Sequence, residues 1–208
     1  MNNSGNHLEY VHWPATVYQL AVFLFVVVSA WLAWPLPEAA FRSDNSPVSW
    51  LSSAQLWALF ALAIRLSAER TLPVSLGLWL SIAMAGMAFD EQFMLHEQWK
   101  FGCADWVVIC RHTWGTELPM LLVGALGLLT AVWLHCVLPR GLAKVQMWAA
   151  ICTGLFALSL DLSGVPSSLV AYEEGFEVVA EAILVGVFLG LCTRDIKHGI
   201  QSRKEDQA

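Results

Sequence analysis

Residues 15–34 read ATVYQLAVFLFVVVSAWLAW, a run of twenty residues without a charged side chain. A helix needs about 20 apolar residues to cross the hydrocarbon core of a bilayer, so this run predicts a membrane-spanning helix. No Lys or Arg stands before it in residues 1–18, and no small-residue cleavage site follows it. We therefore expect a retained helix rather than a cleaved signal peptide.

Five more apolar segments follow the first one along the chain. The 208 residues are 57% hydrophobic and 13% charged, whereas soluble domains carry about 25% charged residues. The expected spans cover residues 15–34, 50–66, 72–97, 117–138, 145–162 and 169–192. The sequence thus predicts an all-α, polytopic integral membrane protein. A single six-helix bundle with short loops would cover residues 1–193, and a polar cytoplasmic tail would cover residues 194–208.

Basic residues predict the orientation, because Lys and Arg are enriched in cytoplasmic loops. With six spans, both termini lie on the same side of the membrane. That side carries eight basic residues, and the other side carries Arg42, Lys100 and Arg111. We expect a multi-pass protein of the cell (inner) membrane with both termini in the cytoplasm.

Two cysteines, Cys103 and Cys110, lie seven residues apart in one loop on the predicted outer side. An oxidising compartment favours a disulfide between them over two free thiols. The sequence therefore predicts a bridge within this loop.

The net charge of −6 is distributed unevenly over this topology. The predicted outer side carries twelve acidic and three basic residues, and the inner side carries five acidic and eight basic residues. This balance argues against nucleic acid as a partner. It also concentrates the surplus of carboxylates on one face of the membrane.

Most of these carboxylates lie where four spans begin or end, and the alternating direction of the spans brings them to one depth. On a continuous helix Asp90 and Glu97 would share a face, because seven residues leave them about 20° apart. Glu181 lies well inside the sixth span, where a carboxylate costs at least roughly 2.5–3.5 kcal/mol. The residues at this level are Asp90, Glu91, His96, Glu97, Glu117, Asp161, Glu173, Glu174, Glu177 and Glu181.

Crowded carboxylates in a membrane need bound protons or a cation, and few basic side chains are near this face. Carboxylates together with one or two histidines suit zinc, iron or manganese. The expected metal ligands are Asp90, His96, Glu97, Glu173 and Glu177. Secondary candidates are Glu91, Glu117, Glu174 and His112. Glu181 or Asp161 would then act as the acid or base.

The preferred interpretation is a metal-binding membrane protein that works as a metal-dependent enzyme on a lipid or other membrane-resident substrate. The chemistry would be hydrolysis or di-metal redox chemistry. One alternative is an accessory or assembly subunit that joins partner membrane subunits. Another is a proton- or cation-coupled carrier that uses the same acids. A network of protonated carboxyls that only fixes helix packing is the structural alternative.

Overall fold

The computed structural model describes residues 13–41, 46–105, 107–138, 141–162 and 167–205. These residues form helices, turns and irregular segments without a strand, which confirms the predicted all-α class. In this part of the chain six helices are long and apolar enough to cross a membrane, as a multi-pass membrane protein requires. They are α1 (Trp13–Leu32), α2 (Pro47–Ala68), α3 (Val74–Phe93), α6 (Leu118–Val137), α7 (Leu142–Leu162) and α8 (Ser167–Glu205).

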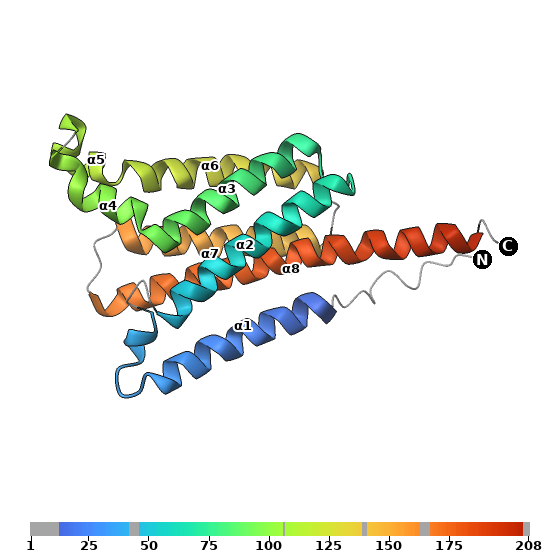
Figure 1. Cartoon of the computed structure of the whole chain (residues 1–208), viewed down its shortest axis with the longest axis horizontal. Coiled ribbons are helices and arrows are strands. Elements are labelled where there is room, and N and C mark those ends of the chain that lie inside the picture. Colours follow the sequence, from blue (N-terminus) through green and yellow to red (C-terminus); the bar gives the residue numbers. More distant parts are fainter. Residues whose placement is uncertain (1–12, 42–45, 106, 139–140, 163–166, 206–208) are drawn as a thin grey trace.

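Helix α2 lies between α3 and α8, and α8 also packs against α1 and α7 (Figure 1). Helix α6 lies on the α7 side of the bundle. The ends of α1, α3 and α7 meet the beginnings of α2, α6 and α8 at the left of Figure 1. We call this the acidic end, because Glu91, Glu117 and Glu174 lie there.

The main apolar core fills the half of the bundle away from the acidic end. Leu59 and Leu66 of α2, Leu76 of α3 and Phe188 of α8 are all at most 1% exposed. Helices α2 and α3 are so close here that a Cβ on Gly77 would collide with the side chain of Ser67. Tight apolar packing therefore separates the acidic end from the opposite end along these helices.

The third span differs from the prediction of one helix over residues 72–97. Helix α3 ends at Phe93, Met94 adopts the left-handed conformation with φ 51°, and α4 (Leu95–Gly102) begins a new direction. The Asp90 carboxylate accepts the backbone N–H of His96 at 2.8 Å. This side-chain hydrogen bond competes with the backbone hydrogen bonds that would continue α3 as one helix. The expectation that Asp90 and Glu97 share a face of one helix is therefore wrong.

A compact segment links α3 to α6 at the acidic end and contains α4, η2 (Cys103–Asp105), η3 (Val108–Arg111) and α5 (Thr113–Thr116). A disulfide joins Cys103 to Cys110, the pair that the spacing predicts. The indole N–H of Trp99 donates to the Gly115 carbonyl at 3.0 Å. These contacts hold the segment folded on itself beside the end of α3.

Two other regions complete the path of the chain. A short 3-10 helix, η1 (Pro37–Ala40), connects α1 to α2. At the other terminus α8 continues as helix to Glu205, so the expected polar tail is helical through most of residues 194–208.

Candidate functional site

The first half of α2 carries a stripe of buried polar side chains inside an otherwise apolar helix. Ser46 is the N-cap, and its hydroxyl accepts the backbone N–H of Ser49 at 3.1 Å. Ser49, Ser52, Ser53 and Gln55 follow, and each of them is at most 5% exposed. We call Ser49, Ser52, Ser53 and Gln55 the α2 polar stripe.

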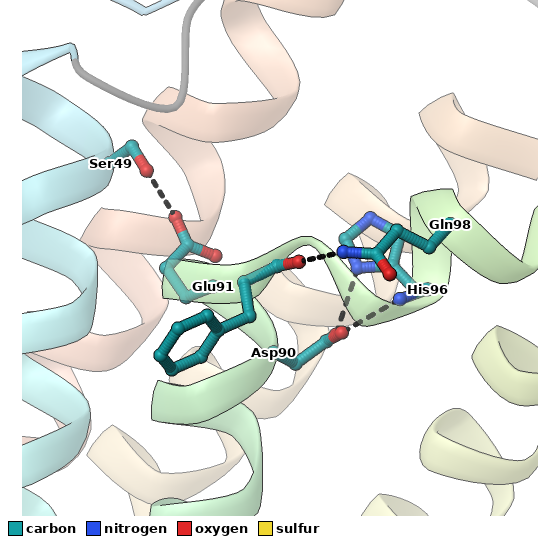
Figure 2. A network of polar contacts seen from close by, with 6 residues as sticks. Ser49, Asp90, Glu91, His96 and Gln98 are labelled. Atoms are coloured by element: carbon teal, nitrogen blue, oxygen red, sulfur yellow. Dashed lines mark hydrogen bonds and ion pairs between the residues drawn. The ribbon is translucent and has the colours of Figure 1, made fainter.

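Half of the α2 polar stripe faces α3. Ser49 and Ser53 are four residues apart and therefore lie on one side of the helix. The Ser49 hydroxyl donates to Glu91 Oε1 at 2.9 Å, as Figure 2 shows. The Ser53 hydroxyl reaches the carbonyl of Ala88 at 3.4 Å. This side of α2 thus fixes the last turns of α3 and the Glu91 carboxylate.

The other half of the stripe faces α8 and binds Glu181. The Ser52 hydroxyl donates to Glu181 Oε1 at 2.9 Å, and Gln55 Nε2 donates to Glu181 Oε2 at 3.4 Å. Gln55 Nε2 also lies 3.3 Å from the carbonyl of Val178. Tyr18 of α1 donates to Gln55 Oε1 at 3.1 Å. Three helices therefore meet in one chain of hydrogen bonds around a carboxyl group within the bundle.

Asp90 and His96 form a second polar unit across the break at Met94. Asp90 Oδ2 lies 2.8 Å from His96 Nδ1, while Asp90 Oδ1 accepts the His96 backbone N–H (Figure 2). A carboxylate only accepts hydrogen bonds, so the ionised Asp90 requires the proton on Nδ1 of the imidazole. Asp90 therefore sets both the position and the tautomer of His96.

Electrostatic interactions connect these units to the acids of α8. Glu174 of α8 interacts with Glu91 of α3, and it also interacts with His96 and Glu97 of α4. Glu181, two turns further along α8, interacts with Glu91 and with Glu174. Acidic groups from α3, α4 and α8 thus share one region.

Most of the predicted site residues lie in this shared region. Glu173 and Glu177 of α8 interact with Glu174 and Glu181, respectively. Asp90 lies there as the partner of His96. Among the side chains that the structure describes, however, no three His, Cys, Asp or Glu are grouped so that they could hold a metal ion.

Three predicted residues lie elsewhere or outside the described side chains. Glu117 forms an ion pair with Lys100 at 3.3 Å, which links α6 to α4. His112 is exposed, and its ring stacks on Trp114 with the centroids 6.2 Å apart. Asp161 belongs to α7, but its side chain lies outside the described residues.

Sequence reasoning missed the α2 polar stripe and Tyr18. Hydroxyl and amide side chains recur every three residues at Ser46, Ser49, Ser52 and Gln55. Residues three apart lie at gradually shifting positions around a helix, because three is slightly less than one turn. A row of them can therefore contact two neighbouring helices. The regular repeat of polar residues in an apolar span is the signal that would have found the stripe.

Comparison of the chain with protein-family models, with curated proteins and with solved structures finds no match. Its function must therefore be argued from the arrangement of its own residues.

Proposed function

We propose that this multi-pass membrane protein binds a divalent or transition metal ion, such as zinc, iron or manganese, at its acidic end. The observation that carries the proposal is the 2.8 Å contact of Asp90 with His96, in a region where Glu91, Glu97 and Glu174 interact electrostatically. Like charges held together in a poorly solvated site repel, and a cation relieves that repulsion. Lys100 pairs with Glu117, so this base is already engaged.

His96 is the nitrogen ligand in this proposal. Metal-binding histidines commonly donate their other ring N–H to a carboxylate, which orients the ring and raises its basicity. The Asp90–His96 contact at 2.8 Å supplies that arrangement. Asp90 then acts as an orienting residue, and Glu97 and Glu174 are the first oxygen ligands to test. Because the described side chains do not form a ready three-ligand group, binding requires these carboxylates to move.

We further propose that the bound ion serves chemistry on a lipid or membrane-resident substrate. The acidic groups lie at one end of the bundle, and buried Leu59 and Leu66 of α2 lie beyond the α2 polar stripe. A site at one end of the bundle, with apolar packing between it and the other end, suits an enzyme better than a carrier. Glu181 is the proposed acid or base, and Ser52 and Gln55 hold its two oxygens in position.

Metal binding is tested by elemental analysis of purified protein. The chain is stripped with a chelator, loaded separately with Zn²⁺, Mn²⁺ or Fe²⁺, and passed through a desalting column. We expect about one ion per chain for one of these metals. His96→Ala and Glu174→Gln should each weaken binding by at least about tenfold.

The matched control is Glu69→Gln, which removes a carboxylate that pairs with Arg65 at 2.9 Å at the opposite end of α2. This variant should bind metal like the wild type. Wild-type protein that retains no stoichiometric ion would overturn the metal proposal. Proton-dependent flux in liposomes that is lost in Glu181→Gln would then support a carrier. Stable co-purification with one membrane partner, unaffected by the acids, would support an assembly subunit.

A further inference from the structure

The outward faces of α2 and α3 are apolar, in contrast to the buried α2 polar stripe. On α2 the exposed positions recur at helical spacing, at Trp50, Ala54, Trp57, Ala61 and Ile64. Such a stripe on a spanning helix contacts the acyl chains of the bilayer. This surface is therefore the part of the chain that meets lipid next to the acidic end.

A hollow of about 250 Å³ interrupts this lipid-facing surface. It is lined by Trp50, Ser53, Ala54 and Trp57 of α2 and by Gln92 of α3. Ala54 explains the hollow, because its small side chain lies between two tryptophans on the same stripe. We call this hollow the α2–α3 groove.

Aromatic contacts make one wall of the groove firm. Trp57 packs edge-on against Phe89 of α3 with the ring centroids 5.4 Å apart. Phe89 in turn stacks on Phe93 at 6.0 Å. Edge-on and stacked ring pairs of this kind add stability beyond their buried area.

The groove adjoins the proposed metal site in the sequence of both helices. Ser49 and Glu91, which are joined by a hydrogen bond, directly precede Trp50 and Gln92 of the lining. Gln92 is an exposed amide among apolar neighbours, so it can hydrogen-bond a polar head at the level where the span ends. The groove thus offers tryptophan walls and the polar groups of Ser53 and Gln92, and its lining directly follows Ser49 and Glu91 in the sequence.

We propose that the α2–α3 groove holds one acyl chain of a membrane lipid and presents its polar head to the acidic end. The occupant is a lipid because the groove is continuous with the bilayer-facing surface of two spanning helices. The assignment of this lipid as the substrate class rests on the proposed function. Its binding in the groove does not, since none of the lining residues is a proposed metal ligand.

The test uses vesicles of phosphatidylcholine that contain a small fraction of phosphatidylcholine with a photoactivatable diazirine in one acyl chain. After illumination, labelled peptides are mapped by mass spectrometry. We expect labelling to concentrate on residues 50–57 and 89–93 by several-fold over the exposed face of α1. Ala54→Phe fills the groove and should remove this excess.

Ala61→Phe is the matched control, because it makes the same change two turns along the same exposed stripe. It should leave the excess labelling intact. Size-exclusion profiles and thermal unfolding check the fold, and Trp57→Ala, which removes one wall, gives a second way to lose the excess. Labelling that is uniform over all exposed faces, or unchanged in Ala54→Phe, would overturn the groove.

Metal content measured on the same samples keeps the two proposals separate. Excess groove labelling in a wild type that binds no metal would overturn the metal site and leave the lipid site standing. A metal-replete wild type with uniform labelling would overturn the lipid site alone.

Discussion

The Ser52 hydroxyl and the Glu181 carboxyl form a hydrogen bond between α2 and α8 inside the bundle. Ser52 is 1% exposed, so a group left without its partner there would have little water to replace it. Interhelical hydrogen bonds in membrane proteins contribute about 0.6 kcal/mol on average and up to about 1.7 kcal/mol. At this site we expect a value near the upper end, because the acceptor is a carboxyl group.

The prediction is that Ser52→Ala lowers the free energy of unfolding by about 1–2 kcal/mol. Reversible unfolding by dodecyl sulfate in mixed micelles measures it. Ser159→Ala is the control, since the Ser159 hydroxyl bonds only locally to the Phe156 carbonyl at 2.7 Å on an exposed face. Equal changes in stability for the two variants would show that the contact with Glu181 contributes nothing.

At the residue scale, the acids were predictable from the sequence and their partners were not. A glutamate such as Glu181 is conspicuous in an apolar span, because charge there is costly. Ser52 by itself is not conspicuous, since small hydroxyl residues are common in transmembrane helices, and only its three-residue spacing from Ser49 and Gln55 marks it. The contact partner of a hydroxyl depends on which helix lies beside it, and a single sequence does not state that.

The break between α3 and α4 determines where His96 lies. Met94 has φ 51°, a left-handed conformation that costs non-glycine residues roughly 1–2 kcal/mol. The sequence around it has no Gly, Asn or Pro, the residues that usually announce the end of a helix. The sequence therefore predicts an uninterrupted span, and the local contact of Asp90 with His96, six residues further along, explains the turn.

We predict that Met94→Gly is more stable than Met94→Ala by about 1 kcal/mol, because glycine adopts the left-handed conformation without strain. Both changes remove the same side chain beyond Cβ, so their difference reports the backbone alone. Thermal unfolding in detergent measures the difference. If the helix ran on through residue 94, alanine would be the more stable by about 1 kcal/mol.

At the scale of the whole molecule, hydropathy located the six long apolar helices of the described residues to within a few residues at most of their ends. It could not place α2 between α3 and α8, because that arrangement depends on contacts such as Ser52 with Glu181, which are 129 residues apart. The even number of spans carries the beginning of α1 and the end of α8 toward the right of Figure 1, away from the acidic end.

The sequence-based orientation yields a prediction for the intact protein in cells. Green fluorescent protein fused to Ala208 should fluoresce, because the C-terminus is expected in the cytoplasm. Alkaline phosphatase fused after Asp105, in the α3–α6 segment, should be active, whereas the same enzyme fused after Arg70 should be inactive. The reverse pattern of activities would show that the acidic end faces the cytoplasm.

The position of α8 at the C-terminal end of the bundle has a consequence for biosynthesis. Ribosomes deliver α2 and α3 to the membrane well before α8 exists, so Ser52 and Gln55 enter the bilayer before Glu181 is synthesised. During that interval the nascent chain must shelter these groups by other means, such as water or the insertion machinery. Docking of α8 is therefore the step that pairs Ser52 and Gln55 with Glu181. A chain truncated before α8 would leave these polar side chains open to recognition by cellular quality control.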